Sequence, residues 1–353
     1  MIKGRGNSSP GPQRIHEPNR HSSIRLICAK TWLLCAYLFL PLHAHAQFDW
    51  VAVTLDNDSF VNTDDGYTNG LYISLFETGE SSQSTPSHDF WITPFMWSMP
   101  KAEEREAVNA YMIGQTMITP SDISIANPGE NEIPYSALLG MTNSFVTYSP
   151  TVADQVSASI GIVGPAAFGE EVQTAVHDLI GATDPQGWDT QLENEVVFQF
   201  SRARTWRTWT SNSQNFDLLL NSEITMGTIR SDINSGAVLR YGRGLEESYV
   251  TTMFANSRML NPSAINYGKY VYFRVQTGYL FNQIFTDGNT FRDSRSVDYE
   301  HEFIELSVGL AWSWKNYSVS FAVSDANILQ SGVEEETLKN LTQYGTLTFA
   351  WRL

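Results

Sequence analysis

The side chains best suited to bind a metal ion lie in the segment TLDNDSF, residues 54–60. Asp56, Asn57, Asp58 and Ser59 place four oxygen-bearing side chains in a row at the end of a predicted strand. On a strand, the two aspartates share one face and the other two residues share the opposite face. Clustered hard oxygen atoms are the ligands that calcium prefers. The same residues also fit a polar junction between strand and loop that is closed by an Asx turn.

A second oxygen-rich segment, NTDDGYTNG at residues 62–70, opens the next predicted strand. Its Asp64, Asp65 and Thr68 come close to the first segment if the two strands pair as a hairpin. The segment ends in an asparagine-glycine pair that resembles a hairpin turn, but the strand LYISLF follows it directly. The glycine is therefore more simply explained as leaving space for a neighbouring group. The two segments together predict a calcium site.

A third segment, residues 160–195, interrupts the strand pattern with helical spacing. In GEEVQTAVHDLIG, Gln173 and His177 lie on one side of a helix, and Gly181 supplies its stop. The apolar residues of another side are Val172, Val176 and Leu179. The ordinary pKa of histidine, ~6.5, suits a general base, although a lone histidine is equally compatible with a structural or merely exposed role.

The elements that must position these segments are β-strands, and the pattern is clearest near the C-terminus. In QYGTLTFAWRL, residues 343–353, one face is apolar and the other is small or polar. The apolar residues are Leu347, Phe349, Trp351 and Leu353. IELSVGLAWSW, residues 304–314, repeats the alternation. Such strands with aromatic residues at their ends are typical of transmembrane barrels, although a soluble sandwich also alternates.

The alternation predicts about twelve strands, an even number as bacterial barrels require. The predicted strands cover residues 48–58, 66–78, 109–120, 134–150, 152–165, 188–206, 214–229, 231–244, 267–285, 297–314, 317–326 and 340–353. Short connections fall at 150–152, 229–231 and 314–317, and long ones at 79–108, 121–133, 166–187, 245–266 and 327–339. Because short turns face the periplasm and long loops face outward in such barrels, we expect the long connections at the extracellular rim. The predicted fold is an all-β, transmembrane antiparallel β-barrel with a short helical insertion near that rim.

Residues 24–46 combine basic residues, the apolar run TWLLCAYLFLPL and the small-residue pattern AHA. That order predicts a secretory signal with cleavage after Ala46, so that 1–46 is removed and 47–353 forms a single barrel domain. The apolar run is shorter than the ~20 residues of a membrane helix, and no later segment is long and apolar enough. A closed barrel remains as a way to cross lipid with every backbone group hydrogen-bonded. We therefore expect the protein in the outer membrane of a gram-negative cell.

The predicted mature chain is acidic and free of cysteine, since Cys28 and Cys35 both lie in the signal. The formal charge of −16 becomes −21, because removal of six basic residues and one acidic residue leaves 16 basic and 37 acidic ones. Such acidity argues against nucleic acid as a partner. It is compatible with divalent cations at an anionic cell surface, and equally with loops that only maintain solubility. No GxSxG, CxxC, HExxH or phosphate-loop pattern occurs.

In chain order, LDNDSF, TDDGYTNG and GPAAFGEEVQTAVHDLIGA…GW…QLENE resemble the outer-membrane lipid A 3′-O-deacylase family (LpxR-type). The resemblance covers essentially the whole mature chain in length and strand number, and is sharpest in residues 50–75 and 160–195. It implies a twelve-stranded barrel with a calcium-dependent site near the outer leaflet, between the wall and a helix. It also implies hydrolysis of the ester that holds the 3′-acyloxyacyl chain of lipid A. Lipopolysaccharide and membrane lipid would then be the partners.

By position, the resemblance implies catalytic roles for Asn57, Asp58, Thr68 and His177. Asn57 and Asp58 match the asparagine-aspartate pair of the first strand, Thr68 matches the threonine of a YT-x-G motif, and His177 matches the catalytic histidine. The implied calcium ligands are Asp58, Asn57 and Thr68. Two helix positions of less defined role are also shared, Glu171 and Gln173.

The chain departs from the family at two positions. The family has a lysine in the loop after the third strand, and this chain has no lysine between Lys101 and Lys269. At the position of a family glutamate stands Thr183, followed by Asp184. Either calcium or an arginine from another loop replaces the lysine, or the substrate lacks a phosphate there, and the acidic loop favours the latter. A phospholipase or other surface acylhydrolase, and a non-enzymatic structural or adhesion barrel, are the alternative functions.

Overall fold

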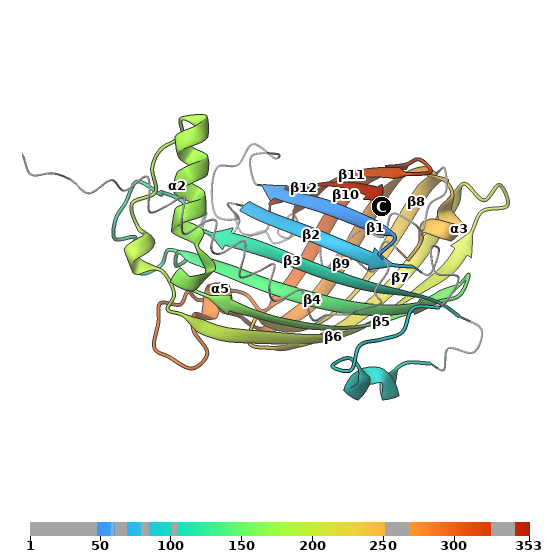
Figure 1. Ribbon diagram of the computed structural model, residues 1–353, viewed down its shortest axis with the longest axis horizontal. Coiled ribbons are helices and arrows are strands. Elements are labelled where there is room, and N and C mark those ends of the chain that lie inside the picture. The colour runs from blue at the N-terminus through green and yellow to red at the C-terminus, as the bar shows by residue number, and fades with distance from the viewer. Residues whose placement is uncertain are drawn as a thin grey trace, which may run out of the picture. The chain divides into compact units, whose positions relative to one another are not determined.

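Twelve antiparallel strands pair in sequence order and close into a barrel, β12 against β1 (Figure 1). The computed structural model describes residues 48–57, 60, 69–78, 85–100, 105–250, 268–325 and 343–353. Its strands are β1 Trp50–Asn57, β2 Asn69–Glu77, β3 Glu106–Ile118, β4 Ser136–Tyr148, β5 Val152–Val163, β6 Glu195–Thr210, β7 Phe216–Gly227, β8 Arg230–Arg243, β9 Lys269–Gln283, β10 Glu302–Ser313, β11 Tyr317–Asp325 and β12 Tyr344–Arg352. Each predicted strand range overlaps one of these strands, so the predicted fold is confirmed.

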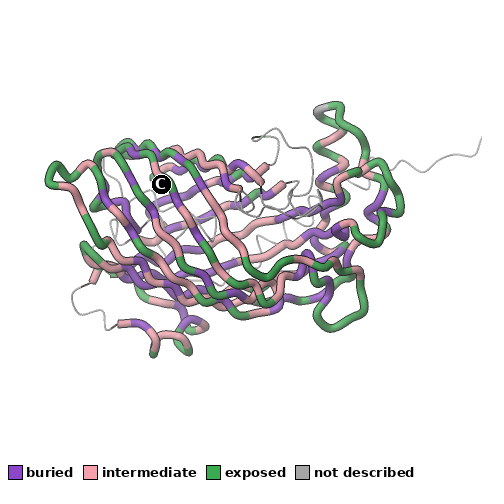
Figure 2. The backbone as a smooth tube through the Cα atoms, turned by 180° about the vertical axis from the view of Figure 1, so that it is seen from behind, coloured by how far each residue is buried: buried purple, intermediate pink, exposed green. Residues whose placement is uncertain are grey.

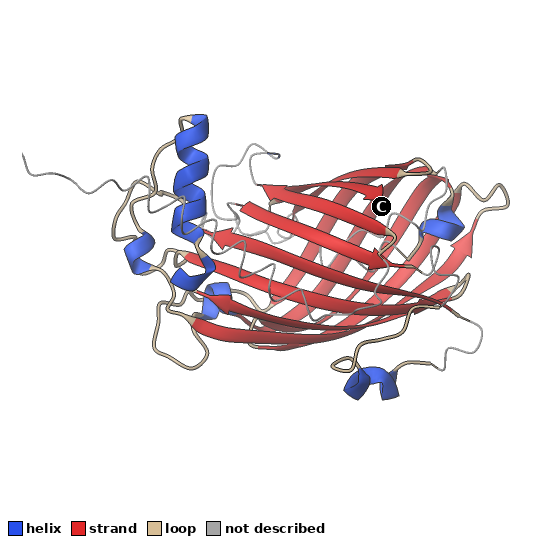
Figure 3. Cartoon of the chain, viewed as in Figure 1, coloured by secondary structure: helices blue, strands red, loops and turns tan. Residues whose placement is uncertain are grey.

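The described helical segments are few and short. They are η2 Thr93–Ser98, η3 Pro165–Ala167, α2 Gly169–Ile180, η4 Trp188–Thr190, α3 Leu245–Ser248 and α5 Ile284–Asp287 (Figure 3). The helix predicted from its spacing is confirmed as α2, which ends at Gly181 in the left-handed conformation, φ 73°. Among the described residues, no helix has the length and apolarity needed to cross a membrane.

The barrel wall alternates between an outward apolar face and an inward small or polar face. On β10, Val308, Leu310 and Trp312 are 58%, 43% and 48% exposed, whereas Ser307 and Ala311 are buried. An outward row of this kind suits contact with hydrocarbon, because the backbone is already hydrogen-bonded within the sheet. The alternation of buried and exposed residues is visible along the strands in Figure 2.

The barrel interior is filled by both apolar and charged side chains. Trp50 and Phe76 belong to the largest buried cluster. Arg240 is fully buried, and its Nη2 and Nε atoms lie 2.6 Å and 2.9 Å from the two carboxylate oxygens of Asp217. The forked geometry neutralises both charges inside the barrel. The barrel interior is therefore filled by side chains at the level of Arg240 and Asp217.

Strand order fixes which connections share an end of the barrel. We call the end that carries α2 the helix end, and the end where β1 begins and β12 finishes the terminal end. At the helix end, five of the six connections have eleven or more residues; at the terminal end, three of the five have five or fewer. The prediction by loop length is nevertheless wrong for three connections. The connections predicted at 79–108 and 245–266 join strands that meet at the terminal end, and the short turn predicted at 229–231 joins strands that meet at the helix end. The end is set by strand order and not by loop length.

Candidate active site at the helix end

A sharp turn after β5 directs the chain into α2. Gly164 has φ 101°, a conformation that L side chains rarely adopt, and a Cβ atom there would lie 2.6 Å from the Glu193 carbonyl carbon. Pro165 starts the short η3 helix, and the Gly164 amide donates to the carbonyl of Ala137 at 3.0 Å. Glycine is therefore required at this position, since it alone allows both the dihedral angle and the close approach.

The first turn of α2 is fastened to the wall of the barrel. A Cβ atom on Gly169 would lie 2.4 Å from the Trp188 ring and 2.6 Å from Cβ of Ala137 on β4. Gln115 of β3 donates its Nε2 hydrogen to the carbonyl of Ala167 at 2.5 Å. The helix stands across the direction of the strands at this end of the barrel (Figure 1).

Gln173 is the polar residue through which α2 faces the protein. Its side chain is 2% exposed, and its Oε1 atom accepts a hydrogen bond of 2.7 Å from Nε1 of Trp188. The Trp188 ring packs on Tyr135 at a centroid distance of 5.0 Å. Burial raises the pKa of Tyr135 to about 12, so its phenol stays protonated and donates to the Ile123 carbonyl. The Nε2 atom of Gln173 is buried and has no partner among the described residues.

His177 lies one turn after Gln173, at the C-terminal end of α2. Gly181 and Ala182 both donate their amides to the His177 carbonyl, at 2.8 Å and 3.0 Å, and so turn the chain back over the helix end. As a result, the carbonyl oxygen of Thr183 lies 2.5 Å from Nδ1 of the His177 ring. A carbonyl oxygen can only accept, so Nδ1 carries the hydrogen and Nε2 of the neutral ring carries the lone pair.

The apolar residues of α2 divide between packing and exposure. Val172 packs on the buried cluster that contains Tyr135 and Trp188, whereas Val176 and Leu179 are 37% and 85% exposed. The predicted apolar side is therefore only in part the packing face. The helix packs through Gly169, Val172 and Gln173, and its exposed apolar residues are free to contact lipid.

The first oxygen-rich segment begins at the same end of the barrel. Asn57 is the last residue of β1 and pairs with Gly345 of β12. Asp56 is fully buried on the inward face, which it shares with Thr54, and pairs with Gly70 of β2. The predicted residues Asp58, Asp64, Asp65 and Thr68 lie outside the described residues. Within the described ranges, no cluster of three His, Cys, Asp or Glu side chains could hold a metal ion.

The loops around α2 are fastened to one another. Gln186 donates its amide to Ile123 at 2.8 Å, joining the β5–β6 connection to the β3–β4 connection. The carboxylate of Glu195, the residue that follows the β5–β6 connection, accepts hydrogen bonds from the amides of Thr290 and Phe291, at 2.9 Å and 3.0 Å. These bonds join the β5–β6 connection to the β9–β10 connection. These bonds give the helix end a continuous rim of three loops.

An arginine of the β9–β10 connection reaches the loop after β3. Nη2 of Arg295 donates to the carbonyls of Pro128, at 3.0 Å, and Gly129. In the same loop, hydrogen bonds from the Ser124 side chain and amide hold the pKa of Asp122 below its usual value. The loop thus carries ionised carboxylates of its own and a cation supplied by another connection.

Three features of the candidate site were missed in the sequence. The Thr183 carbonyl belongs to the backbone and leaves no side-chain signal. Trp188 stands in a predicted strand range that contains η4 instead. Arg295 is distant in sequence from the loop that it contacts. The hydrogen bond to Gln173 reveals the role of Trp188, and the hydrogen bonds to Pro128 and Gly129 reveal that of Arg295.

The closed barrel with an outward apolar band, and a helix over one end, defines the class of protein as an outer-membrane β-barrel. The family model described as "Outer membrane protein LpxR" matches residues 31–353. The chain belongs to this family. Because short turns face the periplasm in outer-membrane barrels, the helix end, where most of the long connections lie, is the extracellular end. No curated protein matches the chain by sequence.

The fold is similar to that of LpxR from Salmonella typhimurium, with a TM-score of 0.65 and 16% identity, covering 86% of this chain and 100% of that one. Two other barrels align less well. The translocator domain of the autotransporter NalP from Neisseria meningitidis has a TM-score of 0.38 and 8% identity, with coverage of 94% and 98%. The KdgM porin has a TM-score of 0.37 and 6% identity, with coverage of 86% and 99%.

Proposed function

We propose that the protein is a calcium-dependent hydrolase that removes the ester-linked 3′-acyloxyacyl chain from lipid A in the outer leaflet, with His177 as general base. Membership of the LpxR family and the location of α2 at the extracellular end support this proposal. The observation that carries it is the 2.5 Å contact between Nδ1 of His177 and the Thr183 carbonyl. That contact selects the tautomer in which Nε2 can accept a proton.

In the proposed reaction, Nε2 of His177 takes a proton from a water molecule whose oxygen attacks the ester carbonyl carbon. The tetrahedral intermediate then breaks the bond between that carbon and the sugar oxygen. The His177 ring returns its proton to the departing 3′-oxygen, which leaves a hydroxyl group on the sugar and releases the acid. This scheme needs no serine nucleophile.

Gln173 is a candidate donor to the developing oxyanion. It lies four residues before His177 and therefore on the same side of α2. Its Oε1 atom is held by Trp188, which leaves the buried Nε2 hydrogens available. A buried amide donor without a protein partner is costly, so a ligand atom at that position would be bound favourably.

The residues near the end of β1 fit calcium by their chemistry. The oxygen donors Asn57, Asp58 and Thr68 are hard ligands, and Asp56, which precedes Asn57 in the chain, is a fully buried carboxylate. Calcium, when bound, would polarise the ester carbonyl. In this proposal, Asp58, Asn57 and Thr68 are the residues that hold the ion.

The test is product analysis of the purified protein in detergent. Lipid A and a phospholipid are incubated separately, with and without calcium, and the products are identified by mass spectrometry. The proposal expects loss of the 3′-acyloxyacyl group from lipid A only in the presence of calcium. Release of fatty acid from the phospholipid alone would show a phospholipase instead. Unchanged lipids under every condition would show a barrel without this enzymatic activity.

A further inference from the structure

The outer wall of the barrel near the terminal end carries charged residues where lipid-facing positions are expected. Asp154 of β5 pairs with Arg204 of β6, and Val156 pairs with Arg202. These residues share a face with Ile160, which is 54% exposed and lies further along β5. Alternation therefore places Asp154 and both arginines on the outside of the barrel.

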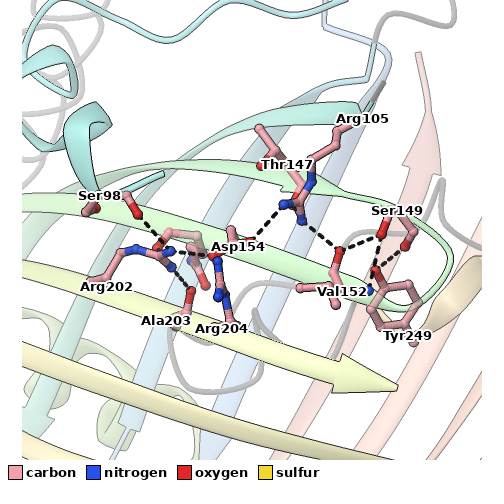
Figure 4. A network of polar contacts seen from close by, with 11 residues as sticks. Ser98, Arg105, Thr147, Ser149, Val152, Asp154, Arg202, Ala203, Arg204 and Tyr249 are labelled. Atoms are coloured by element: carbon pink, nitrogen blue, oxygen red, sulfur yellow. Dashed lines mark hydrogen bonds and ion pairs between the residues drawn. The ribbon is translucent and has the colours of Figure 1, made fainter. Parts of the chain in front are cut away.

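Three arginines surround the single carboxylate of Asp154 (Figure 4). Nη1 of Arg105 lies 2.9 Å from one carboxylate oxygen, and Nε of Arg204 lies 2.7 Å from the other, which Arg202 also contacts. Asp154 is fully buried. Among the described residues, no second carboxylate pairs with these arginines, so the cluster carries an excess of two positive charges.

A connection from the terminal end covers part of this cluster. Residues 85–100, with η2, lie outside the wall (Figure 1) and not in the barrel interior. Ile92 and Met99 pack there on Phe145 and Val156 of the outer face. The carbonyl of Ser98 accepts a hydrogen bond of 3.1 Å from Arg202. This cover shields Arg202 while leaving Arg204 more accessible.

Arg204 is the exposed member of the cluster. Its side chain is 37% exposed, compared with 26% for Arg202 and 12% for Arg105. Its only hydrogen bond within the described part of the chain is from Nε to Asp154, so Nη1 and Nη2 remain available as donors. Trp206 lies beside it, with the guanidinium carbon 5.9 Å from the ring centroid.

Along the same outward row of β6, the charged residues are followed by apolar ones toward the middle of the membrane. Phe200, Phe198 and Val196 succeed Arg202 and Arg204 on that face, and the last two are 40% and 61% exposed. A positive group near the inner surface of the membrane, followed by an apolar track toward its centre, matches a lipid with an anionic head and acyl tails. A guanidinium can bind phosphate oxygens through two parallel hydrogen bonds.

The cover adds exposed aromatic side chains next to this site. Phe90 and Trp97 are 79% and 87% exposed, and Phe95 packs on Phe200 at 4.7 Å. Trp97, whose indole combines an apolar body with a polar N–H edge, favours the level of lipid head groups, and Phe90 adds exposed apolar surface. We propose that Arg204, supported by Arg202 and Arg105, binds the phosphate of a glycerophospholipid in the inner leaflet, with the acyl chains along Phe200, Phe198 and Val196.

The proposal is tested by native mass spectrometry of the purified protein in detergent with added phosphatidylglycerol. A glycosyl diacylglycerol, which has the same tails and no phosphate, is the comparison lipid. We expect retained phosphatidylglycerol on the wild-type protein and about tenfold less on Arg204→Gln, the loss expected for one bidentate charge-assisted contact. Arg292→Gln, which alters an exposed arginine at the helix end, should retain lipid as the wild type does.

Equal retention of the two lipids by the wild-type protein would overturn the proposal without any variant. Unchanged binding in a folded Arg204→Gln protein would also overturn it.

If Arg204→Gln does not fold, Arg204→Lys is the second variant. It keeps the positive charge beside Asp154 and should still bind less phosphatidylglycerol than the wild type, because an ammonium lacks the planar fork. Unaltered binding by Arg204→Lys would then contradict the site. The lipids that co-purify with the protein from the membrane provide another measurement. The species lost in Arg204→Gln should be a glycerophospholipid. Loss of lipid A instead would show that the assignment to the inner leaflet is wrong.

Discussion

Nδ1 of His177 lies 2.5 Å from the carbonyl oxygen of Thr183, six residues further along the chain. The chain reaches this position because α2 ends at Gly181, whose left-handed conformation turns the following residues back over the helix. In the family pattern this position is a glutamate, whose carboxylate could orient the ring. In this chain the backbone carbonyl of Thr183 is placed to do so, and it accepts from Nδ1, which leaves Nε2 as the nitrogen that can take a proton.

The first prediction concerns the histidine itself. His177→Ala should abolish hydrolysis of lipid A, because the scheme has no other base at the site. The side chain is only half-buried, so the barrel should fold normally and keep the heat resistance of the wild-type protein in detergent. Activity is measured by mass spectrometry of the lipid products, and folding by the mobility of unheated and heated samples on a denaturing gel. Full activity of a folded His177→Ala protein would remove the proposed mechanism.

The second prediction separates the Thr183 carbonyl from its side chain. Thr183→Ala keeps the carbonyl and should retain kcat close to the wild-type value. Gly181→Ala meets no neighbouring atom within 4 Å, but it places a side chain at φ 73°, which costs ~1 kcal/mol. The strained turn should displace the Thr183 carbonyl and lower kcat several-fold, with little change in the melting temperature of the barrel. A strong loss of activity in Thr183→Ala would show that the hydroxyl group is the functional part.

The third prediction distinguishes the two ends of the Gln173 amide. Gln173→Glu keeps an oxygen that can accept from Nε1 of Trp188 and removes the Nε2 donor. If Nε2 stabilises the oxyanion, kcat should fall by about 100-fold, the loss typical of one such donor. Gln173→Leu keeps apolar packing but removes both the acceptor and the donor of the amide. The Trp188 donor is then left without an acceptor, which should lower the free energy of unfolding by ~1–3 kcal/mol. A wild-type kcat in Gln173→Glu would show that Gln173 only holds the helix in place and does not contact the oxyanion.

The fourth prediction is calcium dependence. A strong chelator should silence the enzyme, and added calcium should restore it. Magnesium should substitute poorly, since it requires tight octahedral geometry and releases its water reluctantly. Asp58→Asn should raise the calcium concentration needed for half-maximal activity, because it removes one negative ligand. Activity that survives the chelator unchanged would mean that the aspartates at 56–58 serve the structure of the strand end alone.

The barrel could be predicted because each strand repeats one simple rule. Outward apolar and inward small residues alternate on β10 and β12, and other strands of the wall repeat the signal. The helix was also predictable, since Gly181 follows a run of helical spacing that starts at Gly169. These features depend on neighbours in sequence, which is why the sequence is sufficient for them.

Other features depend on contacts between segments that are distant in sequence. Asp154, Arg202 and Arg204 break the outward apolar pattern, and their environment becomes interpretable only when residues 85–100 are seen on the outer wall. The predicted strand at 188–206 began too early, because Trp188 starts η4 and packs on Tyr135; the strand itself begins at Glu195. The carbonyl of Thr183 could not be predicted, because every residue has a backbone carbonyl and the side chain gives no indication of its role.

The last prediction concerns what holds the phosphate of the substrate in place of the family lysine. The loop at 121–133 is acidic, and on sequence alone it favoured a substrate without a phosphate there. The structure places Arg295 against the carbonyls of Pro128 and Gly129 in this loop. A guanidinium at that position can neutralise the loop and bind a phosphate more specifically than a lysine does.

If Arg295 takes the place of the lysine, phosphorylated lipid A should be cleaved faster than its dephosphorylated form at fixed calcium. Arg295→Gln should lower kcat/KM for the phosphorylated form by about tenfold, the value of one charge-assisted contact, and should change the other form little. Arg292→Gln is the control from the same connection, because Arg292 is exposed and paired with Glu193 at 2.8 Å. Equal rates for the two lipids in the wild-type enzyme would instead support the altered substrate preference, since a phosphate at the site would then contribute nothing to the transition state.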